Sequence, residues 1–227
     1  MEFGKKCMPT VGGGRKVSAV HAYFDRLREW KKLPAYKAEP RVDAIVGLVL
    51  PGVLRALRGW EVDVLIPEFP LRLGTLAMGG ATDSKNDNRS FKVDFFVRTA
   101  CGKNLLIEFK TDMSSRRTKQ DGYLLAAQEV GLRGLVDGVA QLEKHSKATE
   151  KYGALMEQLG RIESAGLAAD DAIDILYVQP LPPGEGRGWG FLELADAMRE
   201  KYPDDAFIEA AAETFELWGE EAAKDIT

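Results

Sequence analysis

Cysteine and histidine are scarce in this chain, with two of each among 227 residues. Cys7 and Cys101 are too few for a disulfide framework or a zinc cluster, which favours a reduced, cytoplasmic setting. Long apolar runs are missing as well, and the first ten residues lack the apolar core of a secretory signal, so we expect no membrane partner. The absence of a GxGxxG or Walker pattern argues against a phosphate-binding loop.

A strong net charge is also absent, since the formal charge is −4. That total conceals a gradient: residues 1–41 carry ten Lys and Arg against four Asp and Glu, whereas residues 150–227 carry six against eighteen. Net charge therefore argues neither for nor against a nucleic-acid partner. A basic amino-terminal part and an acidic carboxyl-terminal part would orient an anionic ligand toward the amino-terminal side. The alternative is that both are ordinary solvated helix faces.

Hydrophobic periodicity predicts helices and strands in succession. The clearest helix spans 41–58, where Val42, Ile45 and Val49 begin an uninterrupted apolar stripe. The Gly-rich and then polar stretch 74–90 predicts a mobile loop that could close over a substrate. Further helices are expected at 16–32, from 114 past 124, at 146–163, at 190–201 and at 204–223, and strands at 61–71 and 172–180.

The stretch FKVDFFVRTACGKNLLIEFKTD, residues 91–112, predicts two strands joined by a tight turn. A period of two places Glu108 and Lys110 on one face of the second strand. Ionised groups on an apolar strand are costly unless they are paired or bind a metal. A two-residue loop would turn Asp94 to the opposite face. A three-residue loop would pair Asp94 with Lys110 and Phe96 with Glu108, which gathers Asp94, Glu108 and Lys110 into one cluster.

Asp94, followed fourteen residues later by Glu108-Phe109-Lys110, resembles the Asp...Glu-x-Lys signature of the PD-(D/E)XK, or restriction endonuclease-like, nuclease superfamily. In that superfamily the two strands are neighbours in a mixed sheet, and the acidic pair holds Mg²⁺ for phosphodiester hydrolysis. The resemblance implies that Asp94 and Glu108 hold one or two Mg²⁺, with Mn²⁺ as a substitute. It also implies a ligand from the Phe109 carbonyl and a Lys110 that orients the attacking water.

Families built in this way often recruit a further acidic ligand from the first helix or the first strand. Glu68, at the end of the strand predicted at 61–71, is the first candidate, and Asp43 is the second. Capping of the helix at 41–58 is the simpler explanation for Asp43, and also for Glu39, because acidic groups suit a helix amino terminus.

Basic and polar side chains just beyond the Glu-x-Lys strand predict contacts with nucleic acid. Arg116, Arg117 and Lys119 could clamp phosphates. One branch of the superfamily carries a Gln and a Tyr four residues apart on this helix. Gln120 and Tyr123 are similar, although they lie three apart.

The order helix, strand, strand, strand, helix, strand predicts an α/β restriction endonuclease-like fold, a mixed four-stranded sheet flanked by helices. We expect a basic helical segment at 1–33, the nuclease core at 34–182 and an acidic helical extension at 183–227. The extension is expected to be a packing surface, or a contact for a protein partner or a second copy of the chain.

The function that the resemblance implies is Mg²⁺-dependent hydrolysis of DNA. Two alternatives belong to other classes. The chain could be a nucleic-acid-binding or assembly protein without turnover, because fold does not imply function. Glu108 and Lys110 could also be only a structural ion pair within a sheet.

Overall fold

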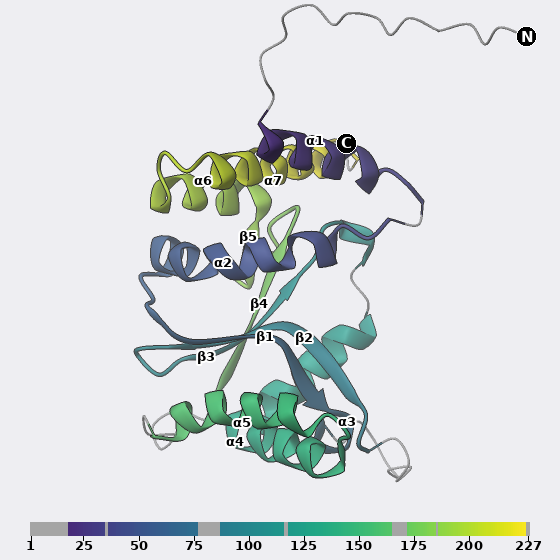
Figure 1. Ribbon diagram of the computed structural model, residues 1–227, viewed down its shortest axis with the longest axis vertical. Coiled ribbons are helices and arrows are strands. Elements are labelled where there is room, and N and C mark those ends of the chain that lie inside the picture. Colours follow the sequence, from purple (N-terminus) through teal and green to yellow (C-terminus); the bar gives the residue numbers. More distant parts are fainter. Residues whose placement is uncertain are drawn as a thin grey trace, which may run out of the picture.

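The chain folds into a mixed α/β structure in which helices cover both faces of a five-stranded sheet (Figure 1). This computed structural model describes residues 18–34, 36–76, 87–115, 118–164, 172–184 and 186–225. No helix within these ranges is long and apolar enough to cross a membrane. Most of the loop predicted at 74–90 lies outside the described residues.

The strands lie in chain order across the sheet. Neighbouring strands from β1 to β3 are antiparallel, whereas β4 lies parallel to β3 and β5 parallel to β4. A parallel pair needs a long connection, and here the connection between β3 and β4 is helical. The bounds are β1 Val62–Arg72, β2 Ser90–Thr99, β3 Asn104–Phe109, β4 Ile173–Gln179 and β5 Gly188–Gly190.

The prediction of four strands is wrong, because β5 adds a fifth from the segment that was expected to be only helical. Two of its three residues are glycines, a residue type that is depleted in strands. Gly188 approaches the backbone of Tyr177 so closely that a Cβ would lie 1.8 Å from the Tyr177 carbonyl oxygen. Local propensity therefore predicts a loop here. In the structure these residues instead pair with β4, and the lack of a side chain at Gly188 allows the close approach.

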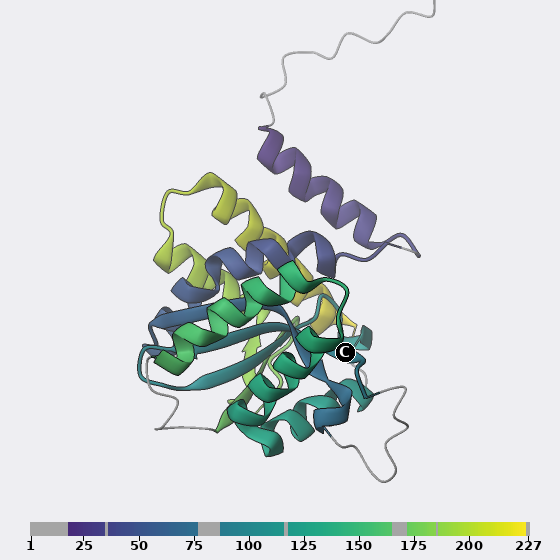
Figure 2. The ribbon, with the colours of Figure 1, turned by 60° about the horizontal axis from the view of Figure 1, so that its bottom comes forward.

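The helices form a layer on each face of the sheet (Figures 1 and 2). One face carries α1 (Ala19–Lys31), α2 (Glu39–Arg58), α6 (Phe191–Lys201) and α7 (Ala206–Lys224). The other carries α3 (Leu73–Leu76), α4 (Thr118–His145) and α5 (Thr149–Ser164). The helices predicted at 41–58, 146–163, 190–201 and 204–223 are all present, with shifts of a few residues at their ends.

The helix α4 changes direction at Gly131, which has φ 76° and ψ 169°. A left-handed φ is rare for residues other than glycine, so this position allows the bend. The helical part before Gly131 begins just after β3 and carries Gln120 and Tyr123. The bend therefore separates the part of α4 that lies near the end of β3 from the part that continues toward α5.

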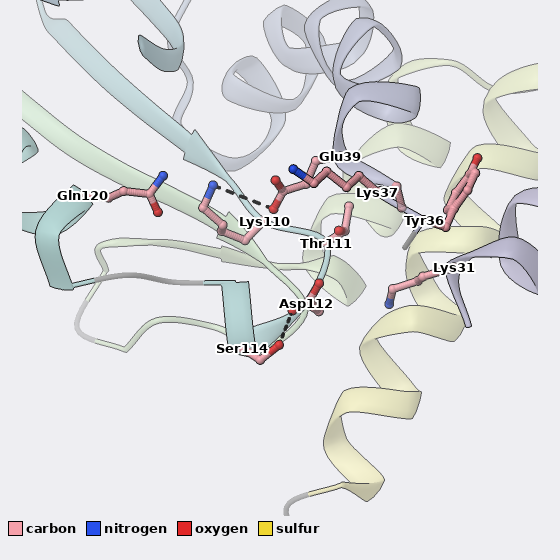
Figure 3. A pocket seen from close by; sticks show the side chains of 10 residues that line it. Lys31, Tyr36, Lys37, Glu39, Lys110, Thr111, Asp112, Ser114 and Gln120 are labelled. Atoms are coloured by element: carbon pink, nitrogen blue, oxygen red, sulfur yellow. Dashed lines mark hydrogen bonds and ion pairs between the residues drawn. The ribbon is translucent and has the colours of Figure 1, made fainter. Parts of the chain in front are cut away.

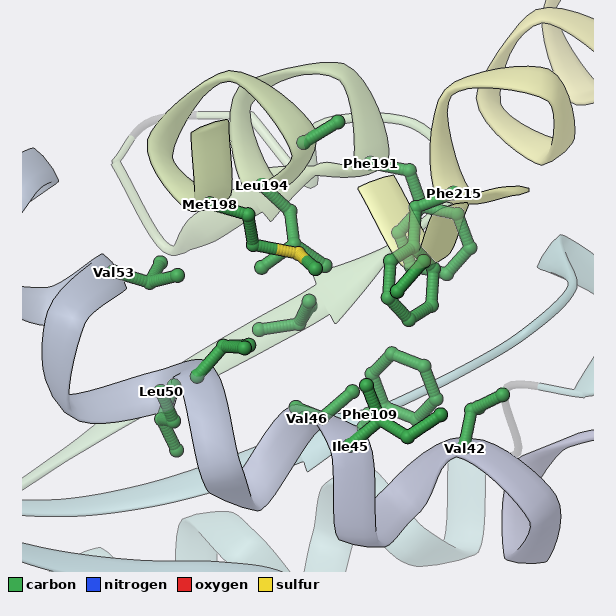
Figure 4. Close-up of a cluster of buried hydrophobic side chains, with 14 of the residues drawn as sticks. Val42, Ile45, Val46, Leu50, Val53, Phe109, Phe191, Leu194, Met198 and Phe215 are labelled. Carbon is green, nitrogen blue, oxygen red and sulfur yellow. The ribbon is translucent and has the colours of Figure 1, made fainter. Parts of the chain in front are cut away.

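The acidic extension contributes to the main hydrophobic core (Figure 4). Phe191 of α6 stacks on Phe109 of β3 with ring centroids 5.7 Å apart, and Phe215 of α7 lies 5.1 Å from Phe191. The boundary predicted at 182/183 consequently falls between two strands of one sheet. The predicted role of the extension in binding a partner stays a prediction.

Candidate active site

The hairpin of β2 and β3 brings the carboxylates of Asp94 and Glu108 together at the Lys110 ammonium. Its turn is formed by residues 100–102, and the Thr99 N–H donates to the Lys103 carbonyl at 3.0 Å. Phe96 lies opposite Leu106, so the predicted pairing of Phe96 with Glu108 is wrong by two residues. A shift of two preserves the facing of every side chain, because side chains alternate with a period of two. The predicted clustering therefore survives the error in register.

Lys110 is at the centre of the cluster. Its Nζ lies 2.7 Å from Glu108 Oε1 and 3.9 Å from Asp94 Oδ2. Lys110 and Glu108 are buried, and Asp94 is partly exposed. The Phe109 N–H donates to Asp94 Oδ2 at 2.6 Å, which fixes the carboxylate against the end of β3. The structure thus brings together the three side chains that the sequence singles out as catalytic.

A third carboxylate in this cluster was not predicted as a site residue. Glu39, in the first turn of α2, has its Oε1 3.8 Å from Lys110 Nζ. The sequence places Glu39 at the start of a helix, where the helix dipole is sufficient to explain an acidic residue. The contact with Lys110 is compatible with that role, since the start of α2 points the Glu39 side chain toward the end of β3.

The two acidic residues proposed as extra metal ligands have other hydrogen-bond partners. Glu68 accepts from Lys92 Nζ at 3.0 Å on an exposed part of the sheet. Asp43 accepts from the Ala44 N–H at 2.6 Å. Both residues line a separate pocket of about 450 Å³ that Asp94 also borders. Their roles as ligands stay predictions, whereas Glu39 is the carboxylate that contacts Lys110 from the first helix of the core.

Burial and mutual repulsion change the charges of these carboxylates. Burial, followed by the nearby Glu108, raises the pKa of Asp94 to about 7. Burial also raises the pKa of Glu108, although Lys110 partly opposes this. Burial alone would lower the pKa of Lys110, but Glu108 and Asp94 more than offset it and raise that pKa above its ordinary value. The ammonium is therefore charged, and the site around it has a deficit of positive charge.

An unpartnered carboxylate oxygen favours a divalent cation at this site, but few of the described residues are available as ligands to hold it. Glu108 Oε2 is buried and has no hydrogen-bond partner in the described part of the chain, and a hard cation would satisfy it. Within the same residues, no three Asp, Glu, His or Cys side chains are arranged to hold a metal ion. Asp94 and Glu108 can supply two carboxylate ligands. Mg²⁺ usually keeps several waters and needs few protein ligands, so two are compatible with it.

A pocket of about 520 Å³ opens beside the cluster (Figure 3). Gln120 lines it on the α4 side, and its Oε1 is buried without a hydrogen-bond partner among the described residues. The other lining residues come from the end of α1, the start of α2 and the segment after β3. They are Lys31, Tyr36, Lys37, Ala38, Glu39, Lys110, Thr111, Asp112 and Ser114.

The remaining residues predicted to bind nucleic acid are placed differently. Tyr123 packs against Phe91, with ring centroids 5.2 Å apart, so of the Gln and Tyr pair only Gln120 lines the pocket. The Lys119 Nζ lies 5.7 Å from the Tyr123 ring centroid. Arg116 and Arg117 lie outside the described residues, and their phosphate-binding role stays a prediction.

Comparison with known proteins identifies no family. No protein-family model, no curated protein and no solved structure matches the chain. The functional argument consequently depends on the residues and their geometry.

The raised pKa of Asp94 predicts a pH-dependent stability that Asp94→Asn removes. Between the ordinary value of 3.8 and about 7, the folded state keeps a proton that the unfolded chain has released. Wild-type stability should therefore fall as pH rises through this window, and the loss should be complete above pH 7. We expect Asp94→Asn to be more stable than wild type at pH 8 by about 2 to 4 kcal/mol, with little difference near pH 4. Thermal melts across this range measure it, and a constant difference at every pH would contradict the assignment.

Proposed function

We propose that this chain is a Mg²⁺-dependent nuclease that hydrolyses phosphodiester bonds in DNA on a restriction endonuclease-like core. The observation that carries the proposal is the ring of Glu39, Asp94 and Glu108 around the Lys110 ammonium, beside a pocket with further cations. The strand arrangement supports it, since an antiparallel hairpin carries the acidic residues and a helical connection leads to the parallel strand β4.

Hydrolysis of a phosphodiester needs positive charge beside the scissile phosphate, because the diester is itself anionic. Mg²⁺, when bound, supplies that charge and makes a nearby water more acidic. Asp94 and Glu108 would hold it, and the buried Glu108 Oε2, which has no hydrogen-bond partner among the described residues, is available as a ligand. The Phe109 carbonyl is a further candidate ligand, by resemblance alone.

Lys110 acts on the phosphate and on the attacking water. Its ammonium is a compact point charge, which suits a crowded site better than a planar guanidinium does. The contacts to Glu108, Asp94 and Glu39 hold Nζ in place before any substrate arrives. A preorganised charge stabilises the transition state without the cost of reorganisation.

A non-catalytic nucleic-acid-binding or assembly protein is the second candidate. The 2.7 Å contact between Lys110 and Glu108 favours it, because that ion pair is complete without a metal or substrate. Buried pairs of this kind occur as structural elements in proteins that have no catalytic site there.

The direct test uses the purified chain with single-stranded, duplex, nicked and branched DNA. We expect cleavage of at least one of these with Mg²⁺ or Mn²⁺, and none after chelation with EDTA, because the carboxylates are proposed to act through the metal. Electrophoresis of end-labelled DNA measures it. Tight binding of one DNA without cleavage of any would favour the non-catalytic candidate.

A further inference from the structure

The pocket beside the Lys110 cluster has a second cationic side, formed by the end of α1. Lys31 is the last residue of α1, and it lines the pocket across from Gln120 (Figure 3). Lys37, in the segment between α1 and α2, also lines the pocket. Cations therefore lie both beside the proposed catalytic cluster and at a distance from it along one pocket.

Lys31 differs from its neighbours in having no ion-pair partner among the described residues. Its Nζ lies 4.6 Å from the centroid of the Trp218 ring, a cation–π contact. The adjacent Lys32 reaches Glu221 Oε1 at 3.7 Å, and Lys110 is held by three carboxylates. Burial lowers the pKa of Lys31, although Glu221, Asp112 and Asp225 partly oppose the shift. A half-buried ammonium without a paired anion is costly unless a ligand supplies one.

The position of Lys31 is fixed by the packing of α1 on α7. Arg28 Nη1 donates to Thr214 Oγ1 at 3.4 Å and lies 3.9 Å from Glu213 Oε2. Together with the contact of Lys31 to Trp218, these interactions hold the end of α1 against the acidic extension. Helix α7 thus supports the end of α1 that lines the pocket.

We propose that Lys31, which lines the same pocket as Lys37, binds a phosphate of the nucleic-acid strand that flanks the scissile phosphate on the α1 side. This inference depends on the proposed function, and it narrows the substrate to a strand that continues past the cleavage point. A pocket of about 520 Å³ has the size of a small-molecule site and exceeds the needs of one phosphate group. A charge-assisted contact to phosphate would also provide the anion that Lys31 lacks.

Binding without turnover provides the test. A fluorescein-labelled single-stranded oligonucleotide is titrated with the protein in Ca²⁺, and anisotropy is recorded between about 50 and 200 mM salt. We expect Lys31→Gln to weaken binding about tenfold and to reduce the log–log salt slope by about 0.7, the value for one phosphate on a single strand. The matched control is Lys32→Gln, which removes the adjacent, exposed charge and should change affinity by less than about twofold. Lys31→Met is a second variant that keeps an apolar chain against Trp218.

The outcomes separate this inference from the proposed function. Equal affinities and slopes for wild type, Lys31→Gln and Lys31→Met would overturn the inference even if the protein cleaves DNA. Weaker binding by both variants but not by Lys32→Gln would support it, even if no cleavage is seen. If the protein cleaves bis(p-nitrophenyl) phosphate, which has no flanking phosphate, Lys31→Gln should leave that rate unchanged. An equal loss on this diester and on DNA would also overturn the inference.

Discussion

Replacing Glu108 by Gln is expected to lower the Mg²⁺-dependent cleavage rate by about a thousandfold or more, the scale on which preorganised electrostatic groups act. The amide is nearly the same size as the carboxylate, and it removes the charge that would hold the cation. Affinity for DNA should change much less, because phosphate contacts outside the metal site provide most of it. Single-turnover cleavage and binding in Ca²⁺, measured on the same preparation, report the two effects separately.

Two further variants serve as controls for Glu108→Gln. Glu68→Gln removes an exposed carboxylate that pairs with Lys92, and we expect nearly wild-type cleavage. Glu39→Gln removes a carboxylate that contacts Lys110, and we expect a clear loss. If Glu68→Gln impaired cleavage and Glu39→Gln did not, the first-strand residue would be the extra ligand, as the sequence suggests. Unimpaired cleavage by Glu108→Gln itself would rule out the proposed metal site.

The cluster of Asp94, Glu108 and Lys110 was predictable because alternation along a strand is a local property. Leu105, Ile107 and Phe109 face the main core, so the intervening residues face the other way. The exact register was not predictable, since it depends on which residues form the turn. The residue predicted opposite Phe96 was therefore wrong, while the predicted clustering of Asp94, Glu108 and Lys110 is present.

Three features could not be predicted from the sequence alone. They are the proximity of Glu39 to Lys110, the position of Lys31 in the pocket and the strand β5. The proximity of Glu39 to Lys110 depends on how α2 packs across the sheet, and no local pattern encodes that distance. The extension carries the largest excess of acidic residues, which suggests a solvated appendage. Its apolar face instead packs Phe191 and Phe215 against β3. Net charge does not distinguish a solvated appendage from a packed one, because a helix with an acidic outer face and an apolar inner face has the same charge in either case.

Replacing Lys110 by Met is expected to destabilise the protein at pH 8 by about 3 to 5 kcal/mol, the cost of removing one partner from a buried ion pair. The change leaves Glu39, Asp94 and Glu108 without the ammonium that they share. That loss should shrink as the pH falls, because protonation of Asp94 and Glu108 removes the unpaired charge. Chemical denaturation at pH 8 and at pH 5 measures it. Lys92→Met removes the exposed partner of Glu68 and should cost less than about 1 kcal/mol.

The effect of Mg²⁺ on stability distinguishes a metal site at the Lys110 cluster from a structural ion pair. In the variant Lys110→Met a cation no longer competes with the ammonium for Asp94 and Glu108, so Mg²⁺ should raise the melting temperature of the variant more than that of wild type. Cleavage should still fall, because the variant lacks the point charge for the phosphate and the water. A structural ion pair predicts the same loss of stability but no recovery with Mg²⁺. Equal shifts with Mg²⁺ in wild type and variant, or none in either, would therefore contradict a metal site at these carboxylates.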